Sequence, residues 1–253
     1  MGEPGIETVT SVLPKLRIEH DIDLVIAQAE NVTGGKSMSV EDMKRLQSVG
    51  VDFFTGGNHT PSRKELHSLL ADPNSPVIGP ANLQISPGPG YKFMPTKQGR
   101  VLIVSILGTT VGREQDIANP LQSIDDILSS TIDEEKVATI VNFHGDYSSE
   151  KVIIGYYLDG KVTAVVGDHW HVPTADAMIL PRRTAHITDV GMCGVLHSSL
   201  GVEFESVVPR WKDNKQTLNV LSNQRPYQFN AVAIKSGPNG LATSIEHIQE
   251  ILS

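Results

Sequence analysis

Side chains that can bind metal ions follow four separate apolar runs of this sequence. They are Glu30 and Asn31, Asn58 and His59, His144, and the pair His169 and His171. This set offers one carboxylate, two carboxamides and four imidazoles, which are suitable donors for two divalent metal ions. Two such ions can activate water and stabilise both the attacking and the leaving oxygen of a phosphoester. The pattern therefore predicts a metallophosphoesterase.

Each motif has another explanation when it is taken alone. The Asn-His pair at 58–59 follows two glycines and is typical of a turn, because glycine permits positive φ. His144 alone is typical of a hydrogen-bonded structural histidine. A buried carboxylate such as Glu30 needs a metal or an arginine nearby, and Arg182 and Arg183 are candidate partners.

The combination of motifs favours the functional interpretation. His169 and His171 lie on the same face if the chain is extended there, because they are two residues apart. Ligands of open α/β sheets gather at the carboxyl ends of strands, where all four motifs are expected. Trp170 either walls the site or packs outward, and Asp146 is expected to be a solvated loop carboxylate.

The elements that must position these motifs alternate between helix and strand. Helices are expected over 6–19, 39–49 and 62–70, and strands over 24–29 and 51–54. Three later runs, at 101–107, 137–141 and 162–166, are rich in β-branched residues and predict strands buried on both faces. A helix over 149–158 would cover this sheet, and the tail is expected to add a strand over 230–234 and then a short helix. We therefore expect an α/β fold with a single domain over 1–253.

Composition and charge restrict the binding partners and the cellular location expected for the protein. The formal net charge of −8 argues against a nucleic-acid scaffold, although a small phosphorylated substrate is compatible with it because bound metal ions reverse the local field. Cys193 is the single cysteine, so neither an intrachain disulfide nor a thiolate zinc cluster can form. The sequence begins without the basic and apolar regions of a signal peptide, and no apolar stretch reaches the roughly 18 residues of a membrane span. We expect a cytoplasmic protein with no membrane segment and no stable nucleic-acid binding.

The motifs, in this order, resemble the calcineurin-like metallophosphoesterases, and specifically the YmdB-type bacterial phosphodiesterases. Further matching segments are Ser-Glu-Lys at 149–151, Thr-Ala-Asp at 174–176 and Ile-Thr-Asp-Val-Gly-Met at 187–192. The resemblance covers nearly the whole chain. It implies a four-layer sandwich, with two central mixed sheets flanked by helices, and assembly into a homo-oligomer.

The resemblance also implies a role for each candidate residue. The metal ligands would be Glu30 as a bridge between two ions, Asn58, His144 and His169 at one ion, and Asn31 and His171 at the other. A hydroxide between the ions would attack phosphorus, because coordination lowers the pKa of water from about 15.7 to about 7. His59 would assist the leaving oxygen. Iron, manganese or zinc would suit these donors.

One departure from the family concerns the start of the chain. The family opens with an apolar strand that ends in Gly-Asp, and this aspartate binds the first metal. Here the sequence begins at Met1 with the residues that would follow that strand. We expect Met1 to be a misplaced start, with roughly five to eight residues before it; a stop codon immediately upstream would contradict this. Smaller departures at 61–62, 145–146 and Cys193 concern substrate preference.

The sequence thus predicts a metal-dependent phosphodiesterase acting on small phosphodiesters. The resemblance implies cyclic nucleotides, either 3′,5′ or 2′,3′, as substrates. The alternative is a noncatalytic metal-binding or regulatory protein with a degenerate first-metal site. A purely structural α/β protein would leave the clustered histidines unexplained.

Overall fold

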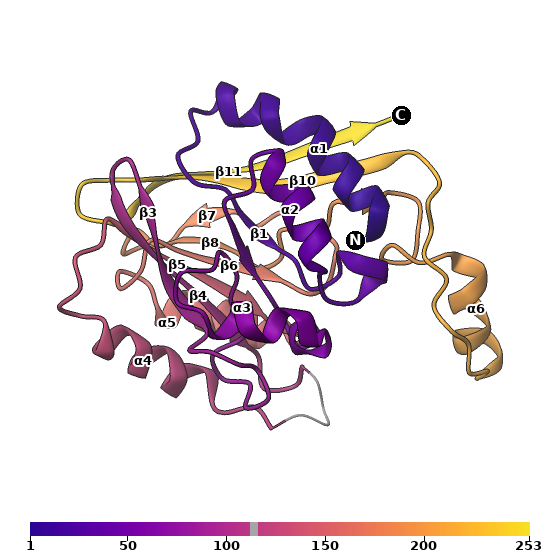
Figure 1. Ribbon diagram of the computed structural model, residues 1–253, viewed down its shortest axis with the longest axis horizontal. Coiled ribbons are helices and arrows are strands. Elements are labelled where there is room, and N and C mark those ends of the chain that lie inside the picture. The colour runs from indigo at the N-terminus through magenta and orange to yellow at the C-terminus, as the bar shows by residue number, and fades with distance from the viewer. Residues whose placement is uncertain (112–115) are drawn as a thin grey trace.

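The computed structural model describes residues 1–111 and 116–253, and Figure 1 shows its elements. The helices are α1 (Gly2–Glu19), α2 (Val40–Ser48), α3 (His67–Ala71), α4 (Pro120–Ser130), α5 (Ser148–Tyr157) and α6 (Phe204–Asp213), with short 3₁₀ turns at Thr33–Gly35, Thr60–Ser62 and Lys64–Leu66. The strands are β1 (Ile26–Gln28), β2 (Phe53–Thr55), β3 (Tyr91–Thr96), β4 (Gly99–Leu107), β5 (Ala138–His144), β6 (Ala164–Asp168), β7 (Met178–Ile179), β8 (Ala185–Ile187), β9 (Gly194–Val195), β10 (Tyr227–Ser236) and β11 (Ala242–Leu252).

The largest sheet has six strands in the order β3-β4-β5-β6-β8-β7. Strands β4, β5, β6 and β8 run parallel, whereas β3 and β7 pair antiparallel at the two edges. The runs predicted at 101–107, 137–141 and 162–166 fall on β4, β5 and β6, which are buried over most of their length. Two smaller sheets accompany it: β1 pairs with β2 in parallel, and β10 pairs antiparallel with β9 and β11.

Hydrophobic side chains cover both faces of the six-stranded sheet. On one face, Ile124 of α4 and Ile154 of α5 belong to a cluster with alternate residues of β4, β5 and β6. On the other face, Phe53 of β2 packs in a cluster with Ile103 of β4, while Ala242 of β11 packs against β6 and β8. Because successive residues of a strand point to opposite faces, each apolar run serves both clusters.

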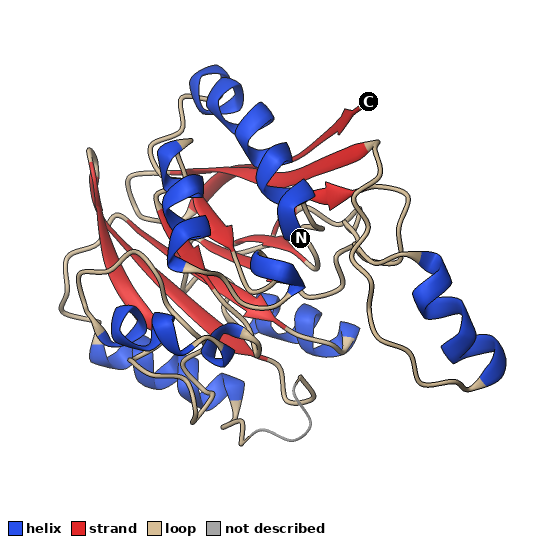
Figure 2. Ribbon diagram, turned by 45° about the vertical axis from the view of Figure 1, so that its right-hand side comes forward, coloured by secondary structure: helices blue, strands red, loops and turns tan. Residues whose placement is uncertain are grey.

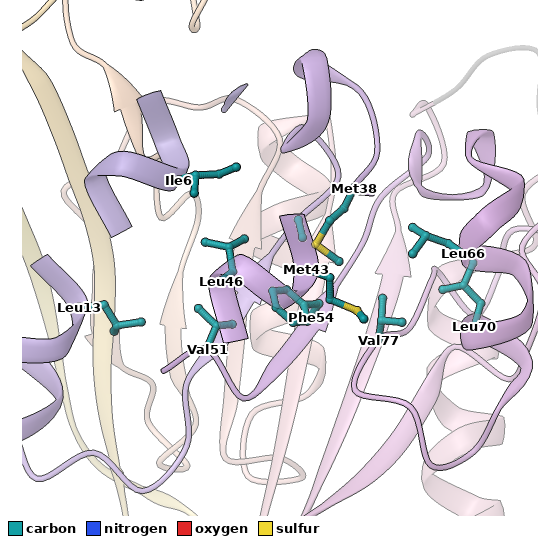
Figure 3. Close-up of a cluster of buried hydrophobic side chains, with 11 residues drawn as sticks. Ile6, Leu13, Met38, Met43, Leu46, Val51, Phe54, Leu66, Leu70 and Val77 are labelled. Atoms are coloured by element: carbon teal, nitrogen blue, oxygen red, sulfur yellow. The ribbon is translucent and has the colours of Figure 1, made fainter. Parts of the chain in front are cut away.

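The outer side of the β1–β2 sheet is covered by α1 and α2. Figure 3 shows Ile6 and Leu13 of α1 and Leu46 of α2 in one buried cluster with Phe54 of β2. Phe54 follows Phe53, so β2 faces these helices on one side and the large sheet on the other. Figures 1 and 2 show α1 and α2 on one side of the sheets and α4 and α5 on the other, while α6 projects away from them. The mixed α/β fold with central sheets and helices is as expected.

Two predicted helices are wrong in whole or in part. In place of a C-terminal helix the chain forms β11, which pairs with β10 along its length, from Tyr227 opposite Leu252 onward. The Asn-Gly sequence at 239–240, just before β11, is typical of a β-hairpin turn and was the signal for this strand. Gly240 has a φ of 75° there. The helix predicted over 62–70 is reduced to two 3₁₀ turns and the short α3, because Ser62 ends a turn rather than capping a helix.

No helix among residues 1–111 and 116–253 combines the length and the apolar character that crossing a lipid bilayer requires.

A buried lysine ties β3 to the segment around α3. The Lys92 side chain is 4% exposed, and its ammonium donates hydrogen bonds to the carbonyl oxygens of Leu69 at 3.0 Å and Val77 at 2.8 Å and to the hydroxyl of Ser75 at 2.7 Å. These acceptors belong to the segment 69–78, in which Pro76 and Ile78 bond to Phe54 of β2. The ammonium therefore donates to several buried oxygens at once.

Replacing Lys92 by methionine keeps the apolar stem and removes the donors. We expect the free energy of unfolding, measured by urea denaturation, to fall by about 1–3 kcal/mol, because buried acceptors lose their partners. Lys97→Met, at an exposed position of the β3–β4 turn, is the control and is expected to change it by less than about 0.5 kcal/mol. Equal stability of the two variants would contradict the role assigned to Lys92.

Candidate metal centre

The predicted ligands lie where the carboxyl ends of two sheets meet. Glu30 comes just after β1, Asn58 just after β2, His144 is the last residue of β5, and His169 follows β6. Both strand pairs run parallel, so their carboxyl ends lie at the same edge. This is the edge at which α/β sheets present their ligands.

The centre of this region is a buried carboxylate–imidazole contact. Glu30 Oε1 lies 3.3 Å from His144 Nε2, and the two side chains are only 3% and 1% exposed. Asn58 Oδ1 is 3.2 Å from the same nitrogen. The His169 ring stands edge-on to the His144 ring, with 4.5 Å between the ring centroids. Single ligand atoms of Glu30, His144 and His169 lie within 4.8 Å of one another.

Gly57 provides the space for this cluster. A Cβ atom at this position would lie 2.0 Å from Glu30 Oε2 and 2.7 Å from a ring carbon of His144. The backbone two residues later also holds the carboxylate, since Glu30 Oε2 accepts a hydrogen bond of 3.1 Å from the His59 backbone N–H. The glycine is therefore required by close approach to the site.

The charges of the cluster are coupled. Burial disfavours the imidazolium form of His144, but the neighbouring carboxylates of Glu30 and Asp168 outweigh it and raise its pKa to about 10. Burial likewise opposes ionisation of Glu30, yet the positive charge of His144 and the nearby His59 hold the Glu30 pKa well below its usual range. Burial and the His144 charge lower the pKa of His169 to about 4, so this imidazole is neutral at neutral pH.

Asp168 was not assigned a role from the sequence, and the structure places it directly behind His144. Its carboxylate accepts hydrogen bonds from His144 Nδ1 and from the Asn142 carboxamide. A carboxylate on the far nitrogen of a ligating histidine fixes the ring and raises its basicity. Asp168 was visible in the motif before His169, but only the register that sets His144 opposite Asp168 reveals the contact.

The remaining predicted residues border the cluster. The Asn31 carboxamide donates to the Gly35 carbonyl at 2.9 Å, and His171 Nδ1 is 3.3 Å from the Leu200 carbonyl oxygen. His59 Nδ1 is 3.4 Å from the Asn58 carboxamide nitrogen.

The chain does not adopt, at His169 and His171, the extended conformation under which the two side chains would share a face. β6 ends at Asp168, and the two histidines have positive φ values of 104° and 63°. The loop rather than a strand face determines where their rings lie. Trp170, between them, is half-buried, and its indole donates to the Asp146 carbonyl at 2.8 Å.

Two further expectations concern charged neighbours. Within the described residues 1–111 and 116–253, the contacts of Glu30 are with His144 and the His59 backbone and not with an arginine. The Arg182 backbone N–H instead donates to Asp159. Asp146, at the rim, has a side chain 49% exposed and 4.0 Å from His169 Nε2.

The chemistry of the cluster fits a divalent metal ion. Glu30, His144 and His169 form the one group of metal-binding side chains found among the described residues, and its donors are oxygen and nitrogen. A buried carboxylate beside two imidazoles, in a space that no Cβ fills at Gly57, can accommodate an ion of the iron, manganese or zinc class.

Comparisons with known proteins place this chain among phosphoester hydrolases. A model of the family described as YmdB-like protein matches residues 1–248. The chain is 34% identical over 216 residues to a 2′,3′-cyclic-nucleotide 2′-phosphodiesterase of Bacillus subtilis (strain 168), and this match covers 85% of the chain and 80% of the relative.

Two crystal structures are similar over almost the whole chain. A hypothetical protein from Thermus thermophilus has a TM-score of 0.90 and 32% identity, over 100% of this chain and 96% of that one. A novel phosphatase from Mycoplasma pneumoniae has a TM-score of 0.91 and 28% identity, over 99% of this chain and 90% of that one.

Metal binding is expected to compete with the proton on His144. Because the metal-free site holds this proton up to about pH 10, coordination must release it, and the apparent Mn²⁺ affinity should rise with pH. We expect an increase of up to about tenfold per pH unit between pH 6 and 8. Calorimetry in two buffers of different ionisation enthalpy measures both the affinity and the proton release. An affinity independent of pH, with no proton released, would contradict the assigned charge state.

Asp168→Asn is expected to weaken metal binding through His144. The amide preserves the shape of the side chain but removes the charge behind the imidazole, and loss of such a partner lowers metal affinity by about 10- to 100-fold. Mn²⁺ titration of the variant measures the effect. Asp126→Asn, at an exposed position of α4, is the matched control and should bind as the unmodified chain does. Equal affinities for both variants would argue against this role of Asp168.

Proposed function

Since the chain belongs to the YmdB-like family, we propose that it is a metal-dependent phosphodiesterase that hydrolyses small phosphodiesters. The observation that carries this proposal is the cluster of the buried Glu30 and His144 with the half-buried His169 at the strand ends. The name of the Bacillus subtilis relative supports 2′,3′-cyclic nucleotides as the first substrates to test, with 3′,5′-cyclic nucleotides as the second. The resemblance to YmdB-type phosphodiesterases expected from the motifs is confirmed by the family match.

The proposal includes a site for two divalent ions. Glu30 would bridge them, and the other ligands would be Asn58, His144 and His169 at one ion and Asn31 and His171 at the other. When bound, such ions supply an activated water and neutralise the charge of the phosphate. The contacts among Glu30, Asn58, His144 and His169 support the first of the two sets.

His59 is the proposed catalytic residue. The Asn58 carboxamide presents its oxygen to His144 and its nitrogen to His59 Nδ1, at 3.2 and 3.4 Å. An amide N–H directed at Nδ1 favours the tautomer of His59 with its proton on Nε2. Burial lowers the pKa of His59, although the charge of Glu30 opposes this. The neutral ring would therefore stabilise the leaving oxygen by donating a hydrogen bond from its Nε2–H, without transferring the proton.

The finer architecture is also part of the proposal. Three separate hydrophobic clusters lie between α1–α2 and β2, between β2 and β4, and between the large sheet and α4–α5. This order supports a four-layer sandwich formed by a single metallophosphoesterase domain over 1–253. A cytoplasmic location and a homo-oligomeric state stay predictions.

The alternative of a noncatalytic metal-binding protein has one observation in its favour. The group found among the described residues holds three ligands, which is enough for one ion, and the Asn31 and His171 side chains contact backbone carbonyls instead. Such a protein would bind one metal ion per chain and hydrolyse no diester.

Hydrolysis of bis(p-nitrophenyl) phosphate and of 2′,3′-cyclic AMP in the presence of Mn²⁺ tests the proposal. We expect His144→Ala to lower kcat/KM by at least about 100-fold, because the variant loses a central ligand. His20→Ala, at the far end of α1, is the control and should retain activity. A folded chain that binds one Mn²⁺ and hydrolyses neither substrate would overturn the proposal in favour of the alternative.

A further inference from the structure

Two segments whose roles the proposed function leaves open meet beneath the loop that carries His169 and His171. Lys151 comes from α5, and Asp189 comes from the segment after β8. Both side chains are 0% exposed, and Lys151 Nζ lies 2.7 Å from Asp189 Oδ2. An ion pair removed from water in this way gains little net stability, because desolvation of the two charges offsets their attraction.

The pair bonds the backbone on both sides of His169. Lys151 Nζ donates to the carbonyl oxygen of Asp168 at 2.5 Å, and Asp189 Oδ2 accepts the backbone N–H of Trp170 at 2.8 Å. The ammonium also lies 4.2 Å from the centroid of the Trp170 ring, within the range of a cation–π contact. The residues immediately before and after His169 are thus attached to the same buried pair.

Asp189 also bonds to its own segment and to the chain that follows His171. Its Oδ1 accepts the Gly191 N–H at 3.0 Å, and its own backbone N–H donates to the Thr174 hydroxyl at 2.9 Å. Thr174 lies shortly after His171 in the chain, so both ends of the histidine loop are connected to Asp189. The carboxylate thereby has a hydrogen-bond partner on each oxygen.

The backbone of this loop needs such support. His169 and His171 have φ values of 104° and 63°, in a region that residues with a Cβ seldom adopt. Conformations of this kind cost about 1–3 kcal/mol each and persist where the surroundings fix them. Removal of the pair takes away the side-chain contacts that hold the backbone on both sides of His169.

We propose that Lys151 and Asp189 are positioning residues that hold the His169–His171 loop in the conformation required for metal binding. The proposal rests on the proposed function, because it assumes that His169 is a ligand. The role of the buried pair is then to maintain the geometry of the site rather than to stabilise the fold. A purely structural pair would lower stability on removal and leave the metal affinity of the folded protein unchanged.

Lys151→Met tests the proposal, with Mn²⁺ affinity of the folded protein as the readout and urea unfolding in EDTA as the measure of stability. We expect a 10- to 100-fold loss of affinity, the usual effect of removing a group that orients a ligand. Lys92→Met is a matched control, because it removes another buried ammonium bonded to backbone carbonyls, in a cluster away from the loop. It should lose stability and keep its affinity within about twofold.

The double variant Lys151→Met/Asp189→Asn removes both charges, so it leaves no uncompensated buried ion. It is expected to fold and to show the same loss of affinity. If the double variant folds and binds Mn²⁺ as tightly as the unmodified chain, the positioning role is overturned. If the unmodified chain itself binds no Mn²⁺, the failure belongs to the proposed function, and the two failures are thus distinguishable.

Discussion

The contact between Glu30 and His144 is the constraint on which the rest of the site depends. It joins the end of a strand in the two-stranded sheet to the end of a strand in the six-stranded sheet, at 3.3 Å and almost without exposure to solvent. Such a contact requires the two sheets to be packed face to face in one register. The cluster that contains Phe53 and Ile103 provides this packing. Apolar side chains with no chemical role therefore set the distance between the two charged groups.

Burial makes this arrangement demanding. A carboxylate and an imidazolium in a dry interior each need partners for all their polar atoms. The partners of the Glu30 carboxylate are His144 and the His59 backbone N–H, and the partners of the His144 ring are Glu30 and Asp168. The absence of a side chain at Gly57 is part of the same arrangement, because any Cβ would occupy the space of the carboxylate. The site is specified as much by these surroundings as by the ligands.

Much of the fold was predictable because apolar and β-branched runs reveal buried strands directly. The strands around 101–107 and 137–141, and the helix that begins near Ser149, follow from local pattern alone. The C-terminal strand, in which Leu252 pairs with Tyr227, could not be predicted from local pattern alone. A strand with an exposed face and a helix share many residue types, and only the partner strand decides between them. The Asn-Gly turn before Ala242 was the available local signal.

The gathering of Glu30, His144 and His169 was predictable from the rule that ligands collect at strand ends. The contact of Asp168 with His144 depends on register, and register is a property of two strands rather than of one sequence. The positive φ of His169 could not be read from residue types, because only a small fraction of non-glycine residues adopt positive φ. Motifs thus identified the side chains that cluster, whereas the groups that orient them became visible only in the tertiary structure.

The separation of the ligands along the chain has a consequence for biosynthesis. Asn58 and His144 are 86 residues apart, and their strands belong to different sheets. A ribosome that has released only the first sheet has produced Glu30 and Asn58 with no imidazole from β5 or β6 beside them. The complete set of proposed ligands is assembled after β6 has left the ribosome and its sheet has packed against the first sheet. Under the proposed function, metal binding would therefore follow this packing. Before that, the nascent chain passes through a stage in which Glu30 is present and His144 and His169 are not.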